Sequence, residues 1–201
     1  MEIILIRHGK TKGNLESRYI GTTDESLCEV GRNHLENYKY PAVDLVFVSP
    51  LKRCIETREI LYPNIKPRMI YNLRECNFGD FENKNYKDLS ENEDYQKWID
   101  SMGTLPFPNG ESRDEFQNRC LESFCQGVII GIKEGMKRIA FIIHGGTIMS
   151  ILEAYAYPKK DYYHWQVDNG EGYIVKIEEN EWIDGLRTLF VTKKCEFLYP
   201  Q

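Results

Sequence analysis

The sequence predicts an α/β fold, a three-layer α/β/α sandwich with a mostly parallel central sheet. Two observations favour it. Short and almost continuously apolar runs occupy residues 3–6, 43–48 and 139–143, as expected for strands that are covered on both faces. Longer stretches with helical periodicity lie between these runs, and alternation of strands and helices is typical of a parallel sheet covered by helices.

The other elements can be placed in order along the chain. Pro50 stands near the start of a helix expected over 50–61, a position that proline favours. A short strand is expected over 69–73, and a modest helical stretch over 86–102. Weaker strand candidates lie at 173–177 and 189–191.

The clearest helix begins near Ser112. This serine is expected to cap the helix, because Glu115 completes a capping-box pattern with it. Apolar side chains then recur every fourth residue, as in a helix that packs on a sheet: Phe116, Cys120, Phe124 and Val128. We interpret this stripe as core without chemistry. A further helix is expected to start near Thr147.

Composition and charge restrict the classes of function. The chain has 201 residues, of which 41% are hydrophobic and 28% charged, so it can form a packed core. Its net charge of -5 argues against nucleic-acid binding, although a pocket of opposite local charge can still bind an anionic small molecule. No apolar run approaches the roughly 20 residues that span a bilayer, so no membrane association is expected.

The N-terminal segment and the cysteines indicate the compartment. The opening MEIILIRHG is too short an apolar stretch for a secretory signal and ends in charge, which favours a cytoplasmic protein. The six cysteines are scattered without a CxxC pair, so we expect reduced thiols rather than a disulfide framework. They are Cys28, Cys54, Cys76, Cys120, Cys125 and Cys195.

Chemistry-bearing side chains directly follow two of the expected strands. Arg7, His8 and Gly9 follow the first strand, and His144 with two glycines follows the strand over 139–143. Ligands of such sheets bind beyond the carboxyl ends of the strands, so the two histidines face one crevice if these strands are neighbours. Neutral imidazole is a competent nucleophile, and arginine suits phosphate. The alternative is a satisfied strand-end histidine beside a surface arginine.

A second arginine follows the strand over 43–48. Arg53 lies in the first turn of the helix over 50–61, where helix amides also favour anions. Its neighbour Lys52 points about 100° away around the helix and is expected to meet solvent. A cation at this end of a helix is unfavourable for the helix itself, and a bound anion would offset that cost. An exposed arginine without a role is the alternative.

A carboxyl group follows the strand over 69–73. Shielding of Glu75 by Phe78 would raise the pKa of this carboxyl and suit it to act as a general acid. An ion pair with Arg74 is the alternative. The glycines after His144, together with the amides of the following helix, form a further segment that suits an anion.

Four segments in this order resemble the histidine phosphatase superfamily, also called the phosphoglycerate-mutase-like family: RHG, SPLKRCIET, LRECNFG and HGG. The resemblance covers nearly the whole chain and implies a single domain over 1–201. It implies that His8 is the nucleophile that becomes phosphohistidine, and that Glu75 protonates the leaving oxygen and then activates water. The residues implied to bind phosphoryl oxygens are Arg7, Asn14, Arg53 and His144, and those implied to lie near the substrate are Gly21, Thr23 and Gly145. Lys10 departs from the family pattern, in which an acidic or amide residue often follows RHG.

The implied reaction is metal-independent hydrolysis of a phosphomonoester, with a small phosphorylated metabolite as the ligand and no cofactor. Preorganised cations can replace a metal in phosphoryl transfer, and two histidines so far apart in sequence are poor evidence for zinc. The compact segment after LRECNFGDFENK resembles the phosphatase branch rather than the longer mutases. A cofactor-dependent phosphoglycerate mutase and a non-catalytic phospho-ligand-binding protein are the alternatives. A homodimer is one candidate assembly.

Within the phosphatase branch, several features are similar to α-ribazole phosphatase, an enzyme of cobalamin nucleotide-loop assembly. These features are Trp98 and residues 18–21, 106–108 and 109–112. The similarity implies α-ribazole 5′-phosphate as a candidate substrate. The alternative is that Trp98 and the nearby prolines form a lid or loop that packs on its own domain.

Overall fold

One seven-stranded sheet forms the centre of the molecule. The computed structural model describes residues 1–195, except for the side chains of Lys193 and Cys195. The strand order is β3-β2-β4-β1-β6-β7-β5. The strands are β1 (Glu2–Arg7), β2 (Leu45–Val48), β3 (Arg68–Met69), β4 (Arg138–Ile143), β5 (Ala156–Tyr157), β6 (Gly172–Lys176) and β7 (Leu189–Cys195). β6 runs antiparallel to both of its neighbours and the other pairs are parallel, so the sheet is mostly parallel, as expected.

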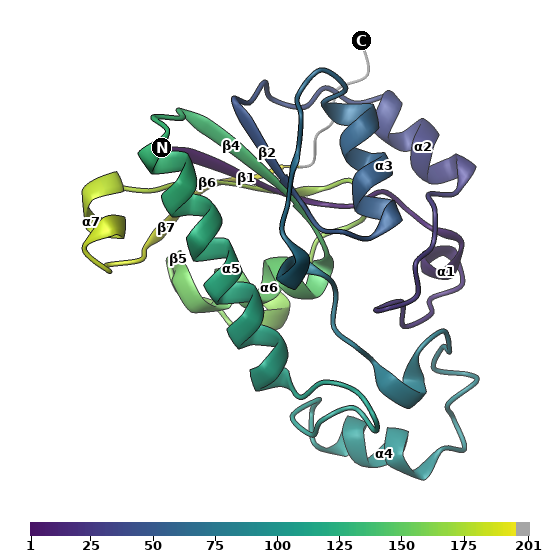
Figure 1. Ribbon diagram of the computed structural model, residues 1–201. Helices are drawn as coiled ribbons and strands as arrows, with labels where there is room; N and C mark the ends of the chain where they lie inside the picture. Colours follow the sequence, from purple (N-terminus) through teal and green to yellow (C-terminus); the bar gives the residue numbers. More distant parts are fainter. Residues whose placement is uncertain (196–201) are drawn as a thin grey trace.

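Helices cover both faces of the sheet and complete the three layers (Figure 1). On one face lie α2 (Glu29–Glu36) and α3 (Lys52–Leu61), and on the other lie α5 (Arg113–Lys133) and α6 (Gly145–Tyr155). The short helices are α1 (Lys12–Leu15), α4 (Glu93–Asp100) and α7 (Glu179–Ile183), with 3-10 turns at Tyr71–Leu73, Gly79–Phe81 and Tyr162–Trp165. No helix among residues 1–195 is long and apolar enough to cross a membrane.

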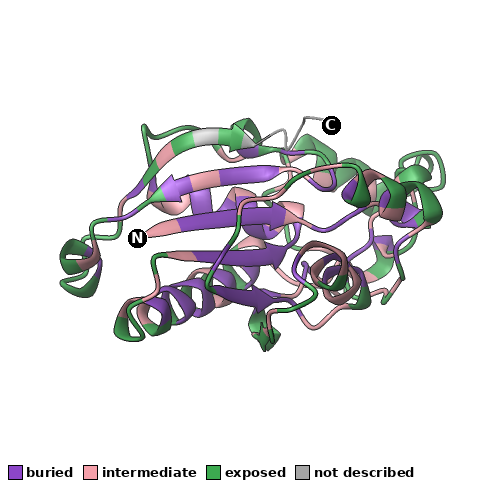
Figure 2. Cartoon of the chain, turned by 90° about the horizontal axis from the view of Figure 1, so that it is seen from above, coloured by how far each residue is buried: buried purple, intermediate pink, exposed green. Residues whose placement is uncertain are grey.

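Side chains that alternate along β1 divide the core between the two faces. Ile3 and Leu5 belong to the cluster under α5 and α6, whereas Ile4 and Ile6 belong to the cluster under α3. The strands of the sheet centre are drawn as a continuous buried band in Figure 2. Burial of each such side chain contributes about 1.5–3 kcal/mol. The expected strands over 3–6, 43–48 and 139–143 are confirmed as β1, β2 and β4. Their sequences are almost continuously apolar because helices cover both faces of the sheet.

Two expected elements are shorter in the structure than the sequence predicts. The strand over 69–73 is wrong beyond Met69, because β3 lies at the sheet edge, pairs only with β2, and gives way to a 3-10 turn. The helical stretch over 86–102 contains only α4. Its start is fixed by Asn92, whose side chain accepts a hydrogen bond of 2.8 Å from the backbone N–H of Tyr95.

The two helices on the α5 face begin close to the expected residues. Ser112 caps α5, and its capping box with Glu115 is present as expected. The four residues of the apolar stripe are buried. α6 begins at Gly145 rather than near Thr147, because His144 is its N-cap. The five described cysteines are free thiols, and the Cys195 thiol lies outside the described side chains.

Candidate active site

Two histidines meet where two neighbouring strands end. β1 and β4 are parallel, and the register places Arg7 beside Ile143, so His8 and His144 leave the sheet at the same edge. Their rings lie edge to face with centroids 5.2 Å apart. His8 is 4% exposed and His144 is 0% exposed. The structure therefore brings both histidines together at one edge of the sheet, as the sequence predicts for neighbouring strands.

Hydrogen bonds orient the His8 ring and the turn that carries it. The Nδ1 of His8 lies 2.7 Å from the carbonyl oxygen of Gly9. A carbonyl can only accept, so Nδ1 carries the proton in the neutral ring and Nε2 keeps its lone pair. Gly9 donates its own N–H to Thr57 Oγ1, and Asn169 Nδ2 donates to the carbonyl of His8. Burial, with Arg53 and Arg7 nearby, holds the pKa of His8 well below 6.5.

His144 is held at the start of α6. Its Nε2 lies 2.7 Å from Ser49 Oγ, at the end of β2. The Cys54 thiol packs against the same ring, 3.6 Å from Nε2. Burial and the neighbouring Arg53 hold the pKa of His144 well below 6.5. The ring is therefore neutral at pH 7.

Two arginines supply the fixed positive charge beside the histidines. Arg53 is fully buried in the first turn of α3 and donates to the carbonyls of Thr23 (2.8 Å), Gly21 (2.9 Å) and Ile20 (3.3 Å). Arg7 donates from Nη1 to the Val167 carbonyl at 2.7 Å. The Nε–H groups of both arginines are buried and donate to no acceptor among the described residues. Both guanidinium groups therefore keep hydrogen-bonding capacity close to the histidines.

The expected contrast between Arg53 and its neighbour is confirmed. The Lys52 side chain is 60% exposed, whereas Arg53 is buried. Gly145 lies against Arg7, since a Cβ atom at Gly145 would be 3.3 Å from Arg7 Nε. Lys10 acts electrostatically on His34 rather than on His8.

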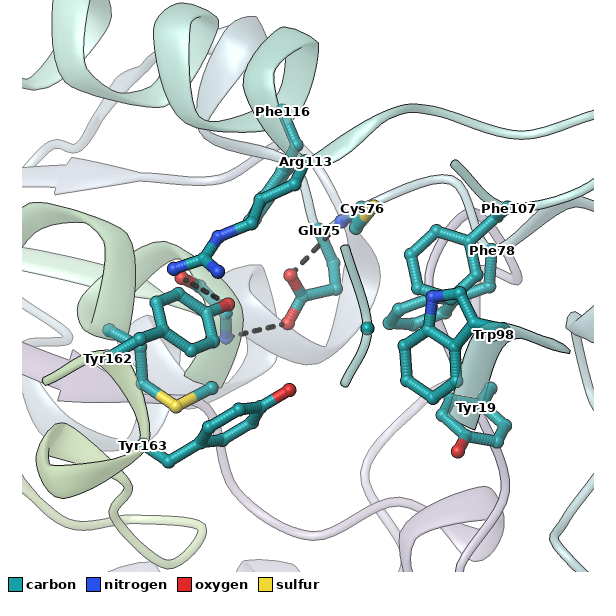
Figure 3. Close-up of a pocket in the computed structure, with 13 residues that line it drawn as sticks. Tyr19, Glu75, Cys76, Phe78, Trp98, Phe107, Arg113, Phe116, Tyr162 and Tyr163 are labelled. Atoms are coloured by element: carbon teal, nitrogen blue, oxygen red, sulfur yellow. Dashed lines mark hydrogen bonds between the residues drawn. The ribbon is translucent and has the colours of Figure 1, made fainter. Parts of the chain in front are cut away.

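Glu75 lies against the start of α6. Its carboxylate accepts hydrogen bonds from the backbone N–H groups of Cys76 (3.0 Å) and Gly146 (3.2 Å), drawn as dashed lines in Figure 3. Burial raises the pKa of Glu75 above its usual value, although these N–H groups and the arginines act in the opposite direction. Arg74 does not pair with Glu75; it donates to Asn72 and lies over the Tyr71 ring. The alternative of an ion pair with Arg74 is therefore wrong, and the role of Glu75 as an acid stays a prediction.

A pocket with a volume of ≈ 210 Å³ opens beside Glu75 (Figure 3). Its walls are mostly aromatic: Tyr19, Phe78, Trp98, Phe107, Phe116, Tyr162 and Tyr163. Arg113 is the one basic side chain of the wall; it is paired with both carboxylate oxygens of Glu153 and lies 4.8 Å from the centre of the Tyr162 ring. Trp98 both lines the pocket and packs against Phe107, with ring centroids 5.2 Å apart.

Of the remaining predicted residues, Asn14 lies in the short helix α1, and Gly21 and Thr23 lie in the loop after it. Asn14 Oδ1 accepts hydrogen bonds from the N–H of Thr11 and from Asn169 Nδ2. Gly21 and Thr23 donate their N–H groups to Glu82 Oε1 at 2.7 and 2.8 Å, and their carbonyls accept from Arg53. Their polar backbone groups thus hold Arg53 in place, and contact with a substrate stays a prediction.

Several residues of this site were missed by the sequence analysis. Ser49 and Thr57 stand in the same segment as Arg53. Ser49 directly follows a strand and Thr57 comes one helical turn after Arg53, and these positions are signals that could have identified them. Asn169 precedes a glycine in a turn, which is a weaker signal. For Arg113 and Tyr162 the sequence offered no signal. No group of three or more metal-ligating side chains occurs within residues 1–195.

Comparisons with known proteins agree with this geometry. A family model described as "Histidine phosphatase superfamily (branch 1)" matches residues 3–186. Phosphoglycerate mutase-like protein 4 of Arabidopsis thaliana is 30% identical over 163 residues, which cover 76% of this chain and 70% of that protein. The adenosylcobalamin/alpha-ribazole phosphatase of Escherichia coli K12 is 27% identical over 179 residues, covering 85% and 87%. The crystal structure of the α-ribazole phosphatase from Shigella flexneri has the same fold, with a TM-score of 0.82 and 23% identity over 98% of this chain and 97% of that one.

Proposed function

The chain belongs to the histidine phosphatase superfamily, branch 1, and on this basis we propose that it hydrolyses phosphomonoesters through a phosphohistidine at His8. One observation carries the proposal. A buried, neutral histidine with its Nε2 lone pair available lies beside a second histidine and two arginines, and the same two arginines act on a carboxyl group whose pKa burial raises. These are a nucleophile, fixed charges for a phosphoryl group, and an acid for the leaving oxygen.

In the first step, His8 Nε2 forms a bond to phosphorus while the bond between phosphorus and the ester oxygen breaks. Glu75 gives its proton to the departing oxygen, so the alcohol leaves neutral. In the second step, Glu75 takes a proton from a water molecule whose oxygen attacks phosphorus. The N–P bond breaks, inorganic phosphate leaves, and Glu75 is protonated again.

Arg7 and Arg53 provide the charge stabilisation that the reaction needs. Phosphoryl transfer depends mainly on positioning and on fixed positive charge around the transferred group. Arg53 is held by three backbone carbonyls and Arg7 by one, so neither side chain has to reorganise during the reaction. We therefore expect activity without an added metal ion.

The aromatic pocket supports a substrate whose alcohol carries a flat, apolar group. Aromatic walls stack on planar rings and bury their surface. α-Ribazole 5′-phosphate is the specific candidate, because a relative that covers most of this chain carries that activity in its name. A phosphoglycerate mutase is the alternative. It would have to bind a substrate with several negative charges, and the pocket wall offers only Arg113, which Glu153 already neutralises.

Hydrolysis of p-nitrophenyl phosphate in the presence of a chelator tests this function. Wild type should be active, and His8→Ala should be inactive. His164→Ala is the matched control, because His164 is an exposed histidine away from the crevice. Equal rates for wild type and His8→Ala would contradict the assignment of the nucleophile. Loss of all activity with chelator would indicate a metal enzyme. Phosphoryl transfer between 3-phosphoglycerate and its bisphosphate, faster than hydrolysis, would identify a mutase.

A further inference from the structure

We propose that Arg119 and Glu111 form a clamp that positions Glu75 as the acid, so that both are positioning residues for the reaction. The proposal rests on the function proposed above, since it needs Glu75 to donate a proton to the leaving oxygen. Neither residue lines the pocket beside Glu75. Both act through the backbone that carries the carboxyl group.

The Arg119 guanidinium binds the chain on the N-terminal side of Glu75. From α5, its Nη1 donates to the carbonyls of Asn72 (2.7 Å) and Arg74 (2.8 Å). Its Nη2 donates to the carbonyl of Glu75 itself at 2.9 Å. One rigid, planar group therefore fixes three carbonyls within four consecutive residues. This segment has little regular structure of its own, because its first two residues end the short 3-10 turn Tyr71–Leu73 and the next two belong to no helix or strand.

Glu111 completes the clamp on the other side of Glu75. Its two carboxylate oxygens accept from Arg119 Nε (2.6 Å) and Nη2 (2.7 Å) in a bidentate pair. The same carboxylate accepts from the N–H of Asn77 at 2.8 Å, and the N–H of Glu111 donates to the Asn77 carbonyl at 2.9 Å. The backbone before and after Glu75 is thus tied to one ion pair.

Burial makes this pair different from the other ion pairs of α5. The side chains of Arg119 and Glu111 are only 12% and 17% exposed. In contrast, Arg68 and Glu134 at the far end of α5 are 43% and 37% exposed in a similar bidentate pair. A partly buried charge is costly unless its partner and hydrogen bonds remain, so removal of either clamp residue releases the Glu75 segment.

A displaced acid has a specific kinetic consequence. A general acid acts only within hydrogen-bond reach of the oxygen it protonates, and small misplacement strongly lowers the rate. The loss depends on the leaving group, because a stable phenolate needs little protonation and an alkoxide needs much. p-Nitrophenyl phosphate and benzyl phosphate make a suitable pair, since each carries an aromatic ring for the pocket.

The experiment compares Glu111→Gln and Arg119→Lys with Glu134→Gln, which breaks the exposed pair between the C-cap of α5 and β3. Glu75→Gln serves as the reference for complete loss of the acid. For both clamp variants we expect kcat with benzyl phosphate to fall about tenfold or more, and kcat with p-nitrophenyl phosphate to fall less than about threefold. KM should change little, and Glu134→Gln should match wild type on both substrates.

The outcomes distinguish failure of the clamp from failure of the proposed function, in which Glu75 is the acid. If Glu75→Gln discriminates between the two substrates and the clamp variants do not, the clamp is overturned and the acid role stands. If Glu75→Gln itself lowers both rates equally, the acid role fails and the clamp fails with it. Thermal unfolding of each variant measures its folded fraction. A smaller folded fraction lowers the rates with both substrates by the same factor. A clamp variant whose two rates fall by one common factor therefore counts against the clamp.

Discussion

The imidazole rings of His8 and His144 lie edge to face, with centroids 5.2 Å apart, in the interior of the protein. The contact depends on the parallel pairing of β1 and β4, which ends both strands at one edge. A phosphoryl group bonded to one ring would therefore lie close to the other. Since Arg53 lowers the pKa of both rings, the same guanidinium is close enough to act on a group bound between them.

The pH profile of kcat/KM should depend on Glu75 at its basic limb. Glu75 must be protonated in the first step, so the rate falls as pH rises through its pKa, which burial raises above the usual 4.5. Glu75→Gln cannot lose a proton and should lack this limb, while the acid limb from protonation of His8 remains. Glu134→Gln is the control and should keep both limbs. An unchanged basic limb in Glu75→Gln would contradict the acid role.

The stability of the protein should fall as pH drops below neutral because of His144. Its pKa is well below 6.5 in the folded state, so the unfolded chain binds more protons below that pH. This site alone lowers the free energy of unfolding by up to about 1.4 kcal/mol per pH unit below about pH 6.5, until the folded pKa is reached.

Denaturant titrations between pH 7 and 5 measure this dependence. His144→Gln should flatten the slope of unfolding free energy against pH. Parallel slopes for wild type and His144→Gln would show that His144 is not buried as a neutral ring.

Orthovanadate should inhibit competitively, because it presents oxygens to the same arginines as a phosphoryl group. Arg53→Lys keeps the charge but loses the planar fork held by three carbonyls, so the inhibition constant should rise about tenfold or more. Lys52→Ala is the control, since Lys52 is exposed on the same turn of α3. Noncompetitive inhibition would place vanadate outside the substrate site.

Trp98 should determine affinity for aromatic substrates rather than the chemical step. Trp98→Ala removes one aromatic wall of the pocket, so KM for benzyl phosphate should rise about tenfold while KM for glycerol phosphate stays near the wild-type value. Tyr86→Ala removes a 59% exposed aromatic side chain and should change neither value. Equal increases for both phosphates would argue against an apolar leaving-group pocket.

The sequence predicts the parts of the site that depend on local pattern. Strands covered on both faces are unbroken apolar runs. The carboxyl ends of β1 and β4, which His8 and His144 follow, could therefore be located without a structure. The strand over 69–73 was wrong because an edge strand with one partner and the exposed Met69 has no such pattern. Glu75, two residues after this segment, was proposed as a general acid from its apolar neighbour Phe78, and the family resemblance implied the same role.

Contacts that arise only from tertiary packing could not be predicted. Asn169 reaches the His8 turn from the loop before β6, and Tyr162 reaches Glu75 from the turn after β5. Arg119 stands on the predicted helix, but its three carbonyl partners belong to a distant loop. Nothing in the local sequence distinguishes these side chains from ordinary surface polar residues.

The most direct measurement is the identification of the phosphorylated residue in Glu75→Gln mixed with p-nitrophenyl phosphate. The good leaving group lets the first step proceed without the acid, and loss of the base slows hydrolysis, so the intermediate accumulates. Denaturation in alkali, digestion and mass spectrometry should find one phosphoryl group on His8, and none in the double variant that also carries His8→Ala. A phosphoryl group on any other residue, or turnover with no covalent intermediate in either protein, would contradict the account.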